Sequence, residues 1–153
     1  MKTRLLSCFL LLAVLALTGC PPMNSKKAAK TSKPPSLGEE SADVDFQAFV
    51  SRLRKVVKAH DVNMLASMMT ENFAYVLGAT PAEDRQGAGV FKYWDDNDLW
   101  PELEGILSER FVPNGAYMVA PPQFADPSVE YHGYRAGILQ VKGSWKFVYF
   151  VKG

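Results

Sequence analysis

The hydrophobic and polar positions of the chain first follow a helical period. Six apolar residues recur at i, i+3, i+4, i+7, i+10 and i+11, with charged side chains between them. This stripe comprises Phe46, Phe49, Val50, Leu53, Val56 and Val57. Asp43 precedes the stripe as a candidate N-cap, and His60 and Asp61 follow it. The pattern predicts an amphipathic helix from Asp43 to about His60 with one buried face.

Two further segments have helical spacing. Val62–Met69 follows the first helix directly, with Asp61 as its predicted cap. Gly89–Leu107 is longer, but the acidic run Asp95–Asp98 interrupts its apolar pattern. We expect two short helices there, with Asp98 capping the second.

Elsewhere the period changes to two. The predicted strands are Phe73–Leu77, Glu109–Val112, Ala116–Val119, Tyr131–Val141 and Trp145–Lys152. Pro113-Asn114-Gly115 provides a turn for a hairpin, and the proline-rich stretch Pro121–Pro127 predicts a rigid loop. Simple alternation in the last strand puts Trp145, Phe147, Tyr149 and Val151 on one face and Val148 and Phe150 on the other. A strand that is apolar on both faces is expected to be central in its sheet.

This order of elements predicts an α+β domain, in which N-terminal amphipathic helices pack on a curved antiparallel sheet of about four to five strands. The chain resembles a known superfamily in three features: the opening helix, the step from Leu65 to a strand at Phe73, and the closing segment Gly143–Val151. Over Phe46–Gly153 these features resemble the NTF2-like (cystatin-like cone) superfamily. The resemblance implies a cone-shaped pocket of the kind that NTF2-like isomerases and dehydratases use.

The N-terminus has the pattern of an export signal. A basic start precedes an apolar stretch from Leu5 to Leu17, which is too short to span a bilayer as a helix. Leu17-Thr18-Gly19-Cys20 follows, and these residues resemble a bacterial lipobox. The resemblance implies that residues 1–19 are a lipoprotein signal peptide, that Cys20 receives a diacylglycerol on its sulfur, and that acyl chains such as palmitate anchor the protein.

Lipidation would make the membrane a partner through Cys20, since two or three acyl chains hold a protein stably on a bilayer. Pro21 stands where an aspartate retains lipoproteins at the inner membrane of enteric-type envelopes. We therefore expect a lipid-anchored cell-envelope protein, on the outer membrane and facing the periplasm if the source has two membranes.

Composition separates a tether from a single domain. Residues 20–41 are rich in proline and lysine and are predicted to be a flexible tether, whereas residues 42–153 are predicted to form one globular domain. The chain is 48% hydrophobic and 12% aromatic, which suffices for a core. Residues 42–153 carry 11 basic and 14 acidic side chains, a net charge of −3. Without a basic face, nucleic acid is not an expected partner.

Candidate chemistry is sparse. Asp95-Asp96-Asn97-Asp98 offers oxygen ligands for calcium, but Trp100 and Ile106 stand where an EF-hand needs glycine and glutamate, so a helix break is the preferred interpretation. After processing at Cys20, no cysteine is left to form a disulfide or a thiolate metal site. We assign no metal site.

The sequence contains no clear catalytic motif either. His60 and His132 are the only histidines, and pairs such as Asp61 with His132 or Tyr75 with Asp98 suit acid–base chemistry without any spacing that selects them. The sequence contains no G-x-S-x-G motif and no phosphate-cradling glycine loop. We assign no catalytic residue and no cofactor.

Aromatic residues are the best candidates for binding. Tyr75, Trp94, Trp100 and Tyr117 are the predicted ligand-contacting residues, because Trp and Tyr line pockets for apolar and glycan ligands and anchor protein interfaces. The favoured hypothesis is a non-catalytic envelope module that binds a small apolar or glycan ligand, or a partner protein.

Two alternatives remain open. One is an NTF2-like enzyme of isomerase, dehydratase or hydrolase type that uses polar groups such as Asp61, Tyr75, His132 and Arg135. The other is a structural lipoprotein that links the membrane to peptidoglycan or to a larger assembly.

Overall fold

The computed structural model describes residues 37–77 and 88–153. The helices and strands are, in chain order, α1 (Leu37–Lys58), α2 (Val62–Met68), β1 (Met69–Ala74), α3 (Ala88–Asp96), α4 (Trp100–Ser108), β2 (Val112–Asn114), β3 (Tyr117–Ala120), the 3₁₀ helix η1 (Pro122–Ala125), β4 (Tyr134–Val141) and β5 (Ser144–Lys152). All of them belong to one compact unit, Pro35–Gly153, which contains the whole described core. None of the helices described combines the length and apolar character needed to cross a bilayer.

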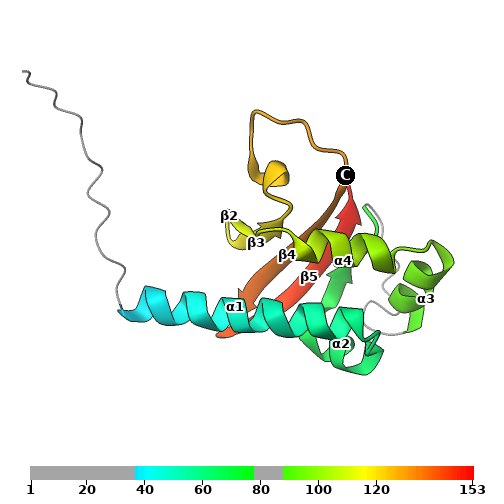
Figure 1. Ribbon diagram of the computed structural model, residues 1–153, viewed down its shortest axis with the longest axis horizontal. Helices are drawn as coiled ribbons and strands as arrows, with labels where there is room; N and C mark the ends of the chain where they lie inside the picture. Colours follow the sequence, from blue (N-terminus) through cyan, green and yellow to red (C-terminus); the bar gives the residue numbers. More distant parts are fainter. Residues whose placement is uncertain (1–36, 78–87) are drawn as a thin grey trace, which may run out of the picture. The chain divides into compact units, whose positions relative to one another are not determined.

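The strands form one mixed, open sheet in the order β1-β5-β4-β3-β2 (Figure 1). The predicted α+β class and the number of strands are therefore confirmed, and β5 is central as expected. An antiparallel sheet throughout was the wrong expectation, because β1 runs parallel to β5. A parallel pair needs a long crossover, and between these two strands the chain passes through α3, α4, β2, β3, η1 and β4.

Helix α1 buries the predicted apolar stripe and ends where expected. All six stripe residues are buried. His60 adopts a left-handed conformation (φ 51°), and the backbone N–H of Asp61 bonds to the carbonyl of Val56 at 3.1 Å, which terminates the helix as a Schellman motif. The predicted start was wrong, because α1 begins at Leu37 and Asp43 lies inside it. Residues 37–41, expected in the tether, are helical.

The segment after α1 follows the prediction at its start. The Asp61 side chain accepts a hydrogen bond from the Met64 N–H at 3.0 Å and caps α2 as predicted. Strand β1 then begins at once, at Met69, four residues before the predicted start at Phe73. The predicted strand continued to Leu77, but β1 ends at Ala74.

The predicted break between α3 and α4 is confirmed, but Asp98 has a different role. It adopts a left-handed conformation (φ 50°), and the Leu99 N–H bonds to the Trp94 carbonyl at 2.9 Å. This geometry is again a Schellman motif, so Asp98 terminates α3. The N-cap of α4 is Leu99, without a side-chain cap bond.

Both predicted hairpins form. The first pairs Val112–Asn114 with Tyr117–Val119, so its first strand lies a few residues later than predicted. Pro113 and Asn114, expected in the turn, belong to β2 instead. The second turns at Lys142 and Gly143, which both have positive φ (49° and 80°), as a tight two-residue turn requires. The segment predicted as a rigid loop contains η1 and contributes to none of the strands described here.

The alternation predicted for β5 was wrong beyond Phe147. Gly137 pairs with Tyr149, whereas its neighbour Ile138 pairs with Phe147, which leaves Val148 as the extra residue of a β-bulge. Phe147 and Phe150 therefore lie in the same core, and Tyr149 points to the opposite face.

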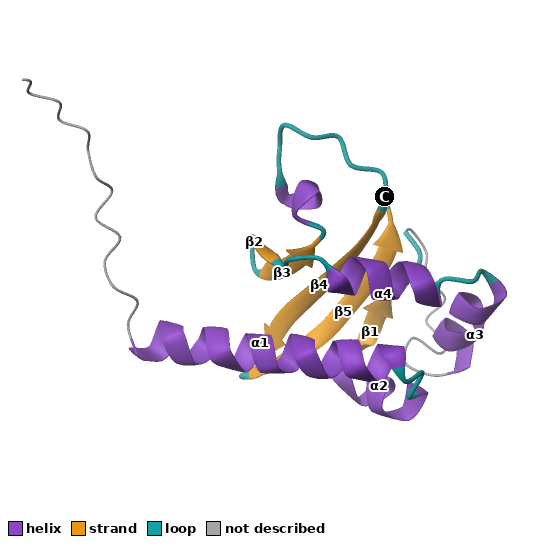
Figure 2. Ribbon diagram, in the orientation of Figure 1, coloured by secondary structure: helices purple, strands orange, loops and turns teal. Residues whose placement is uncertain are grey.

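The two faces of the sheet are covered differently. Helices α1 and α4 lie across one face (Figures 1 and 2), where Ala120, Ala136, Ile138 and Phe150 join the main core. Alternate residues of the same strands point to the opposite face of the sheet. This opposite face, called the outer face below, carries Tyr117, Val119, Arg135, Gly137, Tyr149 and Val151.

Candidate functional site

The space between the helices and the sheet is filled by the core. Its largest fully buried side chains include Trp94, Phe73, Phe147 and Phe150, whose rings meet edge to face at 4.9–5.9 Å. Among the residues whose burial is described, none of the buried ones is polar or charged. This side of the sheet therefore offers packed apolar volume in place of a polar cone.

Three of the four predicted ligand-contacting residues belong to this core. The exposed fractions are 0% for Trp94, 6% for Trp100 and 9% for Tyr75. Trp94 and Trp100 meet edge to face at 5.2 Å, and Tyr75 packs against Tyr93 at 5.3 Å. The structure thus brings the two tryptophans together as packing residues.

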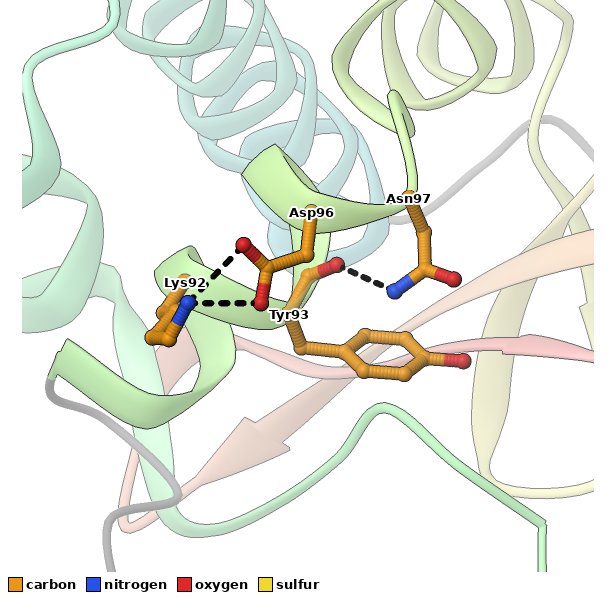
Figure 3. Close-up of polar contacts among 4 residues, drawn as sticks. All are labelled: Lys92, Tyr93, Asp96 and Asn97. Atoms are coloured by element: carbon orange, nitrogen blue, oxygen red, sulfur yellow. Dashed lines mark hydrogen bonds and ion pairs between the residues drawn. The ribbon is translucent and has the colours of Figure 1, made fainter.

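The acidic run Asp95–Asp98, at the C-terminal end of α3, contributes polar contacts to this corner of the domain. Asp95 accepts a hydrogen bond from the Trp100 indole N–H at 2.7 Å. Asp96 pairs with Lys92 at 2.7 Å, and the Asn97 amide donates to the Tyr93 carbonyl at 2.8 Å (Figure 3). Within the described segments, no three His, Cys, Asp or Glu side chains gather as a metal site.

Tyr117 lies apart from the other three predicted residues, on the outer face, and is 40% exposed. It borders a cavity of about 500 Å³. The side chains that line it include Tyr117, Val119, Phe124, Arg135, Tyr149 and Val151. A volume of this size is typical of small-molecule sites.

Tyr149 lines this cavity, and its ring packs on Gly137 of the neighbouring strand. They are register partners on β4 and β5, and a Cβ atom at position 137 would overlap the Tyr149 ring. The ring therefore lies directly over the glycine backbone, a close approach that only glycine permits. The centroid of the Tyr149 ring lies 5.9 Å from the centroid of the Tyr117 ring, so the two tyrosines form one aromatic surface.

Burial raises the pKa of Tyr149 to about 12, although the nearby Arg135 guanidinium acts in the opposite direction. The phenol therefore remains protonated at physiological pH. It is a hydrogen-bond donor and acceptor there and not a base.

Arg135 is the only charged residue among the described side chains that line the cavity. Its guanidinium carbon lies 4.4 Å from the centroid of the Phe124 ring, and this cation–π contact ties β4 to η1. Within the described part of the chain, no carboxylate lies within 4.0 Å of this guanidinium.

The residues of the proposed acid–base chemistry are not gathered. Asp61 is occupied as the cap of α2. The His132 side chain is 73% exposed, and its Nε2 atom lies 3.1 Å from Oε1 of Glu130. Both residues belong to the loop before β4, which lies far from α2 in Figure 1. Tyr75 is in the core, and Arg135 is on the outer face. The arrangement suits binding in the outer-face cavity better than proton transfer.

Sequence reasoning proposed Tyr117 as a ligand-contacting residue and gave Phe124, Gly137 and Tyr149 no role in a site. Their signal is weak, because they come from η1, β4 and β5 and meet only through the sheet register and the bulge. A glycine opposite an aromatic residue is the one sequence hint available.

Several predictions of the sequence lie outside the described residues. These are the signal peptide, Cys20 with its lipid, and most of the tether. Comparisons with protein-family models, with curated protein sequences and with solved structures find no match.

Proposed function

We propose that this protein is a lipid-anchored envelope protein whose domain binds a small ligand without catalysis, in the outer-face cavity. The observation that carries the proposal is the cavity of about 500 Å³, lined by the Tyr117–Tyr149 aromatic surface, Phe124 and Val119. An apolar pocket with few polar groups is the usual form of a small-molecule site.

Binding is favoured over catalysis by the chemistry of the lining. The described lining residues offer one guanidinium and two phenols, and the Tyr149 phenol is held protonated. General acid–base catalysis near neutral pH needs a group that titrates there. No specific observation favours the alternative of an NTF2-like enzyme.

The NTF2-like likeness remains part of the proposal. It is supported by the long amphipathic α1 across one face of the sheet and by the central position of the last strand. The ligand site proposed here is on the outer face, however, and not between the helix and the sheet.

The lipid anchor rests on the lipobox alone. We propose that Cys20 is lipidated and that the domain faces the periplasm from the outer membrane in a two-membrane cell. Metabolic labelling with an alkyne-bearing palmitate should label the protein and should fail for Cys20→Ser. Labelling that persists in the variant would refute this site of attachment.

Native mass spectrometry of the Pro35–Gly153 unit, incubated with an extract of envelope lipids and glycans, tests the binding function. We expect a small-mass adduct, whose mass separates a lipid from a glycan. Tyr117→Ala should weaken its capture, because the variant removes part of the aromatic surface. Met64→Ala is the control, since Met64 is also an exposed apolar residue (47%) and does not line this cavity. A protein-sized adduct alone, or none, would refute the proposal.

A further inference from the structure

We propose that the outer-face cavity selects organic anions, with Arg135 binding a carboxylate or phosphate head while the aromatic surface holds an apolar body. This inference rests on the proposed binding function and adds the charge class of the ligand. It follows from three features of Arg135: its position in the cavity, the absence of a carboxylate partner among the described residues, and its contact with Phe124.

The guanidinium lies in mostly apolar surroundings. Val151, Val119 and the ring of Tyr149 line the same cavity, and Arg135 pairs in register with Val151. A charged group in such surroundings is costly unless it is paired or hydrated. No described carboxylate pairs with Arg135, so an anionic ligand would supply the missing pair.

The contact with Phe124 orients this cation. A guanidinium is planar, and its five N–H donors lie at the edge of that plane. Phe124 lies beneath the carbon atom at 4.4 Å, and Nη1 lies beside Gly153, so the donors that face neither residue are the ones offered to a ligand. Carboxylate and phosphate oxygens accept two parallel N–H bonds from such an edge, which lysine does not offer in the same geometry.

The neighbouring phenol adds to this selectivity. Tyr149 lies close enough to Arg135 for the guanidinium to lower its pKa, against the larger effect of burial. The protonated phenol can donate to an anion that Arg135 binds. None of the described side chains that line the cavity is acidic.

A matched set of probes tests the inference on the Pro35–Gly153 unit. We would measure the affinity of 2-naphthoate, of 2-naphthyl phosphate and of neutral 2-naphthamide by calorimetry. The anions should bind at least about tenfold more tightly than the amide, as expected for a charge-assisted bidentate contact. The better of the two anions identifies the head group.

Two variants separate charge from structure. Arg135→Gln should remove the preference for anions and leave binding of the amide within about threefold. Arg135→Lys keeps the charge and the alkyl stem, and it should retain part of the preference. Arg110→Gln is the control, since Arg110 is exposed and does not line the cavity.

Failure of this inference can be distinguished from failure of the proposed function. Equal binding of the anions and the amide, unchanged in Arg135→Gln, would overturn anion selection and leave the binding function in place. If none of the naphthyl probes binds, the ligand captured from the envelope extract decides: an anionic adduct that Arg135→Gln fails to capture supports the inference, and a neutral adduct overturns it. No probe binding and no adduct would refute the binding function itself.

Discussion

Replacing Gly137 by alanine tests how the outer face is built. A Cβ atom at this position would overlap the Tyr149 ring, which lies over the glycine in the β4–β5 pair. The ring must therefore move away, losing its burial and its contact with Tyr117. Inserting a methyl group into a packed site costs about 1–3 kcal/mol, and we expect Gly137→Ala to lower the free energy of unfolding by this amount.

The same substitution should have the opposite sign once the ring is absent. In a Tyr149→Ala background the overlap disappears, and alanine is favoured over glycine in a strand by about 0.5–1 kcal/mol. The double-mutant cycle should therefore give a coupling energy of about 1.5–4 kcal/mol. Gly105→Ala is the control, because a Cβ atom there meets nothing within 4 Å and α4 should be stabilised by up to about 1 kcal/mol.

Urea unfolding, followed by tryptophan fluorescence, measures these differences in one cooperative transition. A Gly137→Ala variant that is as stable as the wild type would refute the close approach of ring and backbone. The close approach would also be refuted if Gly137→Ala changed the free energy of unfolding equally in the presence and in the absence of the Tyr149 ring.

The remaining predictions concern the α3–α4 corner and the pH dependence of stability. Asp95→Ala should cost about 1–3 kcal/mol in urea unfolding, because it leaves the partly buried Trp100 indole N–H without its acceptor. Asp96→Ala should stay within about 0.5 kcal/mol, because its pair with Lys92 is exposed, and equal costs for the two would contradict the assigned roles. Since the folded pKa of Tyr149, about 12, exceeds its ordinary value of 10.0, the unfolded state loses this proton first and stability falls as the pH rises from 10 to 12. The full difference corresponds to about 3 kcal/mol, which partial exposure reduces to about 1–2 kcal/mol. Tyr149→Phe should lack this loss, and identical alkaline unfolding curves would refute the assignment.

Local patterns in the sequence predicted much of the helical layer. The apolar stripe of α1 is buried as predicted, the Asp61 cap forms, and the break between α3 and α4 falls in the acidic run. These features depend on neighbours within a few residues along the chain. The apolar character of β5 on both faces likewise predicted its central position.

Features that depend on distant residues were not predictable in the same way. The parallel pairing of β1 with β5 joins segments about seventy residues apart, and no local period encodes it. The bulge at Val148 reverses the faces of the residues after it, so Tyr149 points into the cavity although the alternation placed it with Phe147. Trp94 and Trp100 were expected at a pocket because tryptophan suits both cores and sites, and the structure places them in the core.

Methyl NMR of the Pro35–Gly153 unit would test most directly whether the outer face is the binding site. On titration with the envelope extract, the methyl signals of Val119 and Val151 should shift, because both side chains line the cavity. Those of Leu53 and Leu103 should not move, because both belong to the helix-side core. Shifts confined to the leucines, or no shifts at all, would contradict a ligand site on the outer face.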